Sequence, residues 1–257
     1  MPTPSPDALL AFQERQLQAA GYGGPQAPIR YRLMRPAEVR LGETYPLVVF
    51  LHGAGERGDD NRSQLKYLPD VLAAAPQRKR FPCFAIAPQC PADDFWVRLD
   101  WSDPDAVPQA APSAPLAAVR SILAQTLASE PIDPARVYLT GLSMGGFGAW
   151  HLAATNPDDF AALAPVCGGG DPAWAAALKD LPIWAVHGEA DDVVPVGHSR
   201  KMIAAIEAVG GKPKYTELQG VGHDSWTPAY APEFGLLDWL FEQRRSSGGT
   251  GGLSTSA

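Results

Sequence analysis

The residues Gly141-Leu142-Ser143-Met144-Gly145 place a serine between glycines in the pattern G-x-S-x-G. Residues 136–140 before it form a β-branched and aromatic run that predicts a buried strand, and residues 147–155 after it predict a helix. A serine on a sharp turn between strand and helix sits in a strained conformation that flanking glycines permit. Ser143 is therefore the candidate nucleophile, and an ordinary glycine-rich turn is the alternative.

A serine hydroxyl is a poor nucleophile unless an imidazole removes its proton and a carboxylate orients that imidazole. Asp191 comes just after an apolar run at 182–187, and His223 lies in a glycine-flanked loop after a run at 213–217. The chain order Ser, Asp, His allows all three side chains to meet at one edge of a parallel sheet, where such sheets bind ligands. Asp192 is a rival carboxylate, and a buried structural role is the alternative for the histidine.

Acyl transfer also needs N–H donors aimed at the developing oxyanion. One donor is expected from the backbone of Met144, the residue after the candidate nucleophile. The second is expected from Ala54, in a glycine turn that follows the apolar run at 45–51. A simple strand-to-loop turn is the alternative for that segment.

The remaining polar candidates near these motifs receive other roles. The other four histidines are weaker candidates for the base. His52 belongs to a glycine turn and His151 to a helix interior, while His187 ends a strand and His198 starts a helix. Asp224 is expected to cap a turn.

Alternating strands and helices must position these residues, and the pattern predicts a doubly wound α/β fold. Apolar runs at 45–51, 83–87, 137–140, 162–166 and 182–187 predict mostly parallel strands covered on both faces. Helical spacing of apolar residues appears at 116–128 and 199–209, and the last helix is expected at 232–244. The strict alternation at 29–33 predicts an antiparallel edge strand, and the aperiodic loops at 55–61 and 88–115 suit functional roles.

The length of 257 residues predicts one folded domain with terminal additions. We expect an N-terminal extension or helix at 1–28, a catalytic domain at 29–244 and a disordered, glycine- and serine-rich tail at 245–257.

Composition excludes several function classes. The net charge of −7 argues against nucleic acid as a partner, and no apolar run is long enough for a membrane span. The N-terminus lacks a signal-peptide pattern, which favours a cytoplasmic location without excluding a secreted mature form. The three cysteines lack metal-ligand spacing, although a bridge between Cys83 and Cys90 stays open. The sequence does not indicate the oligomeric state.

Four motifs in this order resemble the α/β-hydrolase superfamily over about residues 29–244: Leu51-His52-Gly53-Ala54-Gly55, Gly141 to Gly146, His187 to Pro195, and Gly222-His223. The segments Gly53 to Gly58 and Ala87 to Pro91 are similar to the carboxylesterase, phospholipase and predicted-peptidase branch. That branch includes feruloyl esterases and relatives of dienelactone hydrolase. No separate lid domain is evident, which counts against a true lipase.

The resemblance implies a role for each candidate. Ser143 would be the nucleophile, His223 the general base and acid, and Asp191, favoured over its neighbour by the family spacing, the orienting carboxylate. Ala54 and Met144 would donate to the oxyanion, without metal or cofactor. A dienelactone-hydrolase activity is not expected, because those enzymes use cysteine at the position of this serine.

The expected substrate is a small-molecule carboxylic ester with a short or an aromatic acyl group. Trp96, Trp101 and Trp226 lie in loops near the expected site and are candidates for the substrate pocket, although packed structural roles fit them equally. A serine peptidase of the same fold and a non-catalytic ligand-binding protein are the alternatives.

Overall fold

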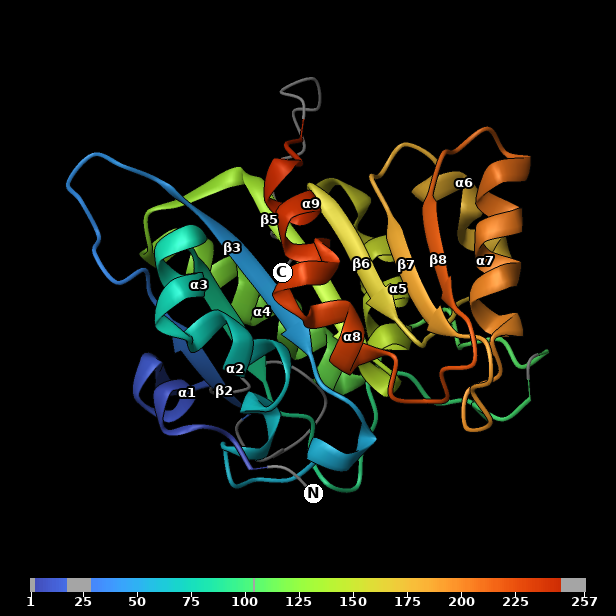
Figure 1. The fold of residues 1–257 in the computed structure, drawn as a ribbon, viewed down its shortest axis with the longest axis horizontal. Helices are drawn as coiled ribbons and strands as arrows, with labels where there is room; N and C mark the ends of the chain where they lie inside the picture. The colour runs from blue at the N-terminus through green and yellow to red at the C-terminus, as the bar shows by residue number, and fades with distance from the viewer. Residues whose placement is uncertain (1–2, 18–28, 104, 246–257) are drawn as a thin grey trace.

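A computed structural model describes residues 3–17, 29–103 and 105–245, which fold around one sheet (Figure 1). Within these residues the sheet has eight strands in the order β1-β2-β4-β3-β5-β6-β7-β8. The six strands from β4 through β3 to β8 in this order pair in parallel, whereas β2 pairs antiparallel with both β1 and β4. Their bounds are β1 (Phe12–Leu17), β2 (Ile29–Met34), β3 (Tyr45–Leu51), β4 (Phe84–Pro88), β5 (Ile132–Leu142), β6 (Ala162–Val166), β7 (Trp184–Gly188) and β8 (Lys214–Leu218).

The central strand β3 shows why the sheet is covered on both faces. All seven of its residues are buried. Because successive side chains of a strand point to opposite faces, Leu47, Val49 and Leu51 enter one apolar core, and Val48 and Phe50 enter the other. The continuous apolar run that predicted a doubly covered strand is thereby explained.

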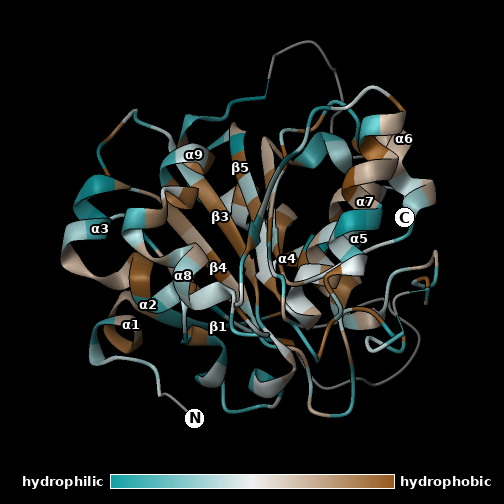
Figure 2. Ribbon diagram, turned by 45° about the vertical axis from the view of Figure 1, so that its right-hand side comes forward, coloured by the Kyte–Doolittle hydropathy of each residue, from teal (hydrophilic) through white to brown (hydrophobic). Residues whose placement is uncertain are grey.

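Helices supply the outer layers of both cores. On one face lie α4 (Ala114–Ser129), α5 (Met144–Thr155), α6 (Ala175–Leu178) and α7 (Gly197–Ala208). On the other lie α1 (Pro6–Ala11), α2 (Leu68–Ala73), α8 (Trp226–Tyr230) and α9 (Leu236–Glu242), with α3 (Ala75–Arg80) beside α2. Figure 2 shows apolar strands at the centre and polar residues on the outer helices. The predicted doubly wound α/β architecture is confirmed.

The edge of the sheet differs from the sequence-based expectation. Residues 29–33 form an antiparallel strand as predicted, but β1 pairs outside β2 and takes the edge. Four consecutive residues of β1, from Gln13 to Gln16, are exposed, so the strand lacks an alternating pattern and depends on main-chain pairing. Part of the predicted extension at 1–28 thus belongs to the sheet, while residues 18–28 and 246–257 lie outside the described residues.

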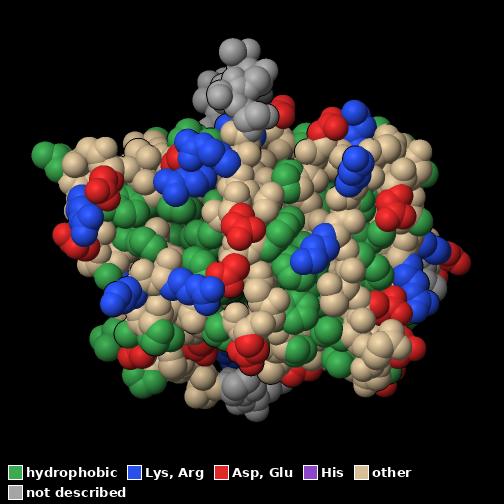
Figure 3. Space-filling model, turned by 45° about the horizontal axis from the view of Figure 1, so that its top comes forward, with side chains coloured by type: hydrophobic (Ala, Val, Ile, Leu, Met, Phe, Trp, Pro, Cys, Tyr) green, Lys and Arg blue, Asp and Glu red, His purple; other side chains and the backbone are tan. Residues whose placement is uncertain are grey.

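Three further expectations concern the surface and the cysteines. All three cysteines are buried free thiols, so Cys83 and Cys90 are not bridged. No helix among the described residues is long and apolar enough to cross a membrane. Figure 3 shows acidic and basic side chains interspersed over the face that it draws.

Candidate active site

The turn between β5 and α5 holds Ser143 in a conformation that L-residues rarely adopt, with φ 53° and ψ −121°. The flanking glycines are required because backbone passes close on both sides. A Cβ on Gly145 would overlap the carbonyl oxygen of Leu51, and one on Gly141 would overlap that of Gly145. The strand, turn and helix therefore lie where the sequence pattern placed them.

The structure brings Ser143 and His223 together, 80 residues apart in the sequence. The serine Oγ lies 3.0 Å from His223 Nε2, and His223 Nδ1 lies 2.8 Å from Asp191 Oδ2. Because a carboxylate can only accept, the imidazole donates from Nδ1, which leaves Nε2 to accept the serine proton. The histidine side chain is 20% exposed, so solvent or a ligand can reach this hydrogen-bonded chain.

Asp191 lies in a loop that presents several donors to its fully buried carboxylate. Oδ1 accepts from the backbone N–H groups of Val193 at 3.0 Å and Val194 at 2.8 Å. Burial alone would raise the pKa of Asp191, but hydrogen bonds from His187, His223 and the Val194 N–H outweigh it and hold the pKa well below its usual range. Asp192, the rival carboxylate, is exposed.

His187 is a contact of this carboxylate that sequence reasoning missed. Its Nε2 lies 3.3 Å from Asp191 Oδ2 and 2.9 Å from the Val194 carbonyl oxygen. Its Nδ1 lies 2.8 Å from Ser199 Oγ, which in turn donates to the Gly168 carbonyl at 2.9 Å. The signal was the spacing of four residues between this histidine and Asp191 across the turn after β7.

The two expected oxyanion donors lie at the ends of neighbouring strands. Ala54 begins the short 3-10 helix η1 (Ala54–Glu56) after β3, and Met144 begins α5 after β5. Within the part of the chain that the structure describes, no acceptor is recorded for the backbone N–H of either residue. Both groups are therefore available to an oxygen at the site.

His52 fixes the candidate oxyanion loop, residues 52–56, through two hydrogen bonds of its ring. Its Nε2 accepts from the Cys90 N–H at 2.9 Å, and its Nδ1 donates to the Gly53 carbonyl at 2.7 Å. Burial lowers its pKa to about 4, so the ring is neutral at physiological pH, as one donor and one acceptor require. The Trp96 indole donates to the His52 carbonyl at 3.0 Å.

The three candidate tryptophans occupy different positions. Trp96 is fully buried, and its ring packs against that of His52 in the core. Trp101 is partly exposed, with its ring edge-on to Phe95 at 5.6 Å. Trp226 is partly exposed, with its ring edge-on to His223 at 5.1 Å between centroids. Trp226 thus contacts a member of the hydrogen-bonded chain through its ring.

Tyr67 packs against Trp226 and was not among the predicted residues. Its ring lies 5.6 Å from that of Trp226, in an edge-on arrangement. Its backbone has φ 64°, which is unusual for a residue other than glycine. Strained backbone of this kind clusters at functional sites, but nothing in the local sequence signals it.

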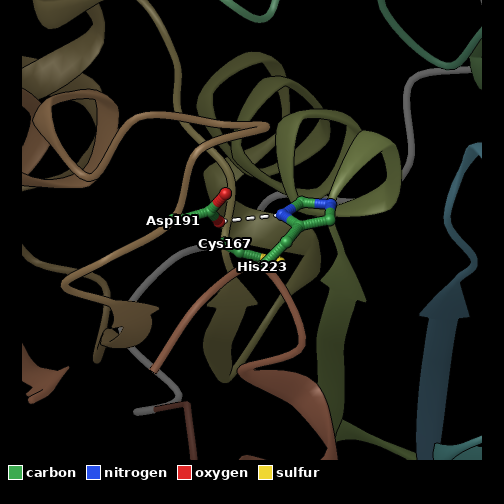
Figure 4. Close-up of side chains that lie close together, drawn as sticks. All are labelled: Cys167, Asp191 and His223. Atoms are coloured by element: carbon green, nitrogen blue, oxygen red, sulfur yellow. Dashed lines mark hydrogen bonds and ion pairs between the residues drawn. The ribbon is translucent and has the colours of Figure 1, made fainter. Parts of the chain in front are cut away.

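A buried thiol lies beside the Asp191–His223 pair. Figure 4 shows the His223 ring facing Asp191, with Cys167 next to them, and ligand atoms of all three lie within 4.8 Å of one another. A cation would need the thiolate, but burial raises the pKa of Cys167 well above its usual range. The carboxylate is also already bonded to imidazole and backbone donors. The cluster is better suited to hold an imidazole than a metal ion.

The parallel sheet, the strained serine between strand and helix, and the order Ser, Asp, His define the chain as an α/β-hydrolase. The comparisons with known proteins agree. The family model described as Phospholipase/Carboxylesterase matches residues 40–230. The chain belongs to this family, as the resemblance of its motifs predicted.

Individual relatives give the same assignment. NocK of Nocardia uniformis subsp. tsuyamanensis, an esterase by name, is 28% identical over 233 residues, which are 88% of this chain and 62% of that protein. The crystal structure of a thermostable esterase has 40% identity and a TM-score of 0.83, over 93% of this chain and 64% of that one. The chain thus spans less than two thirds of either protein. A feruloyl esterase module from Clostridium thermocellum shares the fold at 15% identity, with a TM-score of 0.66 over 95% of this chain and 92% of that one.

Proposed function

We propose that this protein is a serine carboxylic-ester hydrolase that acts through an acyl-enzyme intermediate. The observation that carries the proposal is the chain of hydrogen bonds from Ser143 Oγ through His223 to Asp191. Each atom in it has the donor or acceptor role that a nucleophile, a base and an orienting carboxylate need. The Ala54 and Met144 N–H groups complete the arrangement as oxyanion donors.

The mechanism follows from these roles. Ser143 Oγ bonds to the acyl carbon while its proton passes to His223 Nε2, and the carbonyl electrons move to the oxygen that faces Ala54 and Met144. Collapse of this intermediate breaks the bond to the alcohol oxygen, which takes the proton from His223. Water then adds to the acyl carbon through the same proton transfers, releases the acid and restores the serine. Asp191 stabilises the imidazolium that forms in each half-reaction.

The substrate class is proposed from the surroundings of His223. Trp226 lies edge-on to His223, and Tyr67 lies edge-on to Trp226, so the two rings place aromatic surface beside the base. Trp101, which is partly exposed, is a further candidate. Aromatic surface suits esters with aromatic acyl groups as well as short aliphatic ones. We therefore propose small esters of these two kinds as substrates.

Hydrolysis of p-nitrophenyl esters of increasing acyl length, including the benzoate, tests the proposal. Ser143→Ala should lower kcat on the order of 10⁶-fold, because the nucleophile of a triad is removed. Circular dichroism of this variant checks that the fold persists. An active variant would refute the mechanism, whereas inactivity of both proteins on every ester, with hydrolysis of peptides or saturable binding instead, would favour a peptidase or a receptor.

A further inference from the structure

A buried ion pair lies beneath the candidate oxyanion loop. The carboxylate of Glu56, the last residue of η1, lies 3.4 Å from Lys66 Nζ. The two side chains are only 5% and 8% exposed. Burying two charges is unfavourable unless both are well paired, so this pair adds little to stability compared with apolar residues of the same size. Its place in the fold suggests another role.

The Glu56 carboxylate packs directly against the backbone that precedes Ala54. The Glu56 N–H donates to the Gly53 carbonyl at 3.3 Å. Burial raises the pKa of Glu56, and Lys66 with the nearby backbone N–H groups of Gly53 and Glu56 offsets part of that rise. A Cβ on Gly53 would lie 3.2 Å from Glu56 Oε2 and 2.8 Å from Leu142 Cδ1. A side chain at position 53 would therefore displace the Leu142 side chain and crowd the Glu56 carboxylate.

Three consecutive peptide units of this loop are each held by a different side chain. In the first unit the His52 carbonyl accepts from the Trp96 indole at 3.0 Å, and the Gly53 N–H faces the Glu56 carboxylate. In the next two units the Gly53 carbonyl accepts from His52 Nδ1 at 2.7 Å, and the Ala54 carbonyl accepts from Arg57 Nε at 3.0 Å. A peptide unit is planar, with its N–H opposite its C=O. Fixing the Gly53 carbonyl therefore fixes the direction of the Ala54 N–H, provided that the unit before it cannot rotate. The Trp96 indole restrains that unit at its carbonyl, and the Glu56 carboxylate, whose Oε2 lies close to Gly53, restrains it at its N–H.

We propose that Glu56, itself held by Lys66, is a positioning residue that aims the Ala54 N–H at the reacting carbonyl oxygen. The inference rests on the proposed ester hydrolysis and adds a residue to it. The role requires a hydrogen-bond acceptor at position 56 and not its charge. An amide should therefore replace the carboxylate once Lys66 is also neutral, whereas an apolar side chain should not.

Two double variants separate these requirements. Glu56→Gln with Lys66→Met keeps an acceptor for the Gly53 N–H, and Glu56→Leu with Lys66→Met removes it, while neither leaves an unpaired buried charge. On p-nitrophenyl acetate the leucine variant should have a kcat at least about tenfold below that of the glutamine variant, with KM within about twofold, because an oxyanion donor acts in the transition state. Its affinity for phenylboronic acid, whose tetrahedral adduct with Ser143 places an oxygen at the donors, should fall in parallel.

Asp133→Asn is the matched control, since Asp133 is another buried carboxylate, paired with Arg136 and Arg244 at the far end of β5. It should lower the melting temperature without changing kcat. Glu56→Met replaces the leucine variant if the latter does not unfold cooperatively.

Three results would overturn the proposal: equal kcat in the two double variants, a loss confined to KM, or a loss of kcat that Asp133→Asn reproduces at equal loss of stability. Absence of Ser143-dependent hydrolysis by the wild type would overturn the proposed function together with it. The first three leave the proposed function intact.

Discussion

Replacement of Asp191 by asparagine tests the hydrogen-bond directions at the site. In the native protein Oδ1 accepts from two backbone N–H groups, of Val193 and Val194, and Oδ2 accepts from His223 Nδ1. Asparagine has a single oxygen, which satisfies the two backbone donors only if the NH₂ group takes the place of Oδ2. A donor then faces the Nδ1 of His223. The ring must move its proton to Nε2, where it points at Ser143 Oγ and can no longer accept from it.

The magnitude follows from the two orientations open to the asparagine. Turning the amide to restore the His223 contact would leave the Val193 and Val194 N–H groups against a donor, at about 1–3 kcal/mol for each unsatisfied group. The orientation that satisfies the backbone is therefore favoured, and the wrong tautomer dominates. A wrong tautomer of the base costs on the order of 10⁴-fold in kcat, which is about 5 kcal/mol of transition-state stabilisation.

The assay is the initial rate of p-nitrophenyl acetate hydrolysis for Asp191→Asn and for Asp192→Asn. Asp192 is adjacent and exposed, so its variant is matched in chemistry and should retain the wild-type kcat. Circular dichroism should show both variants folded. A kcat for Asp191→Asn within tenfold of the wild type, or a larger loss for Asp192→Asn, would refute the assignment of the carboxylate.

Two further predictions concern pH and substrate. Because the folded protein holds the pKa of Asp191 below its usual range, this group contributes to the free energy of unfolding above about pH 4 and loses that contribution as the pH falls further. The free energy of unfolding in urea should therefore differ less between the wild type and Asp191→Asn at about pH 3 than at about pH 7. A difference that does not change with pH would contradict the lowered pKa of Asp191. Trp226→Ala should lower kcat/KM for p-nitrophenyl benzoate about two- to tenfold more than for the acetate, because aromatic surface is lost beside His223. Equal losses for both esters would instead indicate an effect through the His223 ring.

The parts of the site that were predictable from the sequence lie at strand ends. Ser143 and Asp191 follow buried parallel strands, whose apolar runs and glycine turns are local signals. Because the carboxyl ends of parallel strands share one edge of the sheet, chain order alone indicated that these side chains could meet. The same apolar runs predicted the parallel strands, and the α/β architecture built on them is confirmed.

The residues that sequence reasoning missed depend on contacts between distant segments or on backbone geometry. Tyr67 contacts Trp226 across 159 residues, and its φ of 64° follows from no glycine or asparagine signal. Lys66 is buried against Glu56, although lysine is usually exposed. The edge strand β1 carries an exposed polar run, and its pairing with β2 gives it order that its side-chain pattern does not predict.

The strained backbone at Ser143 and Cys167 is held by hydrogen bonds to the neighbouring strands. Ser143 and Cys167 both have positive φ, 53° and 40°, which costs on the order of 1–3 kcal/mol for each residue. Their backbone N–H groups nevertheless continue the hydrogen-bond ladder from β5 to β6 and from β6 to β7, with 2.9 Å bonds to the Val166 and Val186 carbonyls. The sheet therefore fixes the serine backbone without using its side chain. Among the described residues the hydroxyl has one recorded partner, His223, so Oγ is free to exchange its proton with the base and to turn toward an acyl carbon.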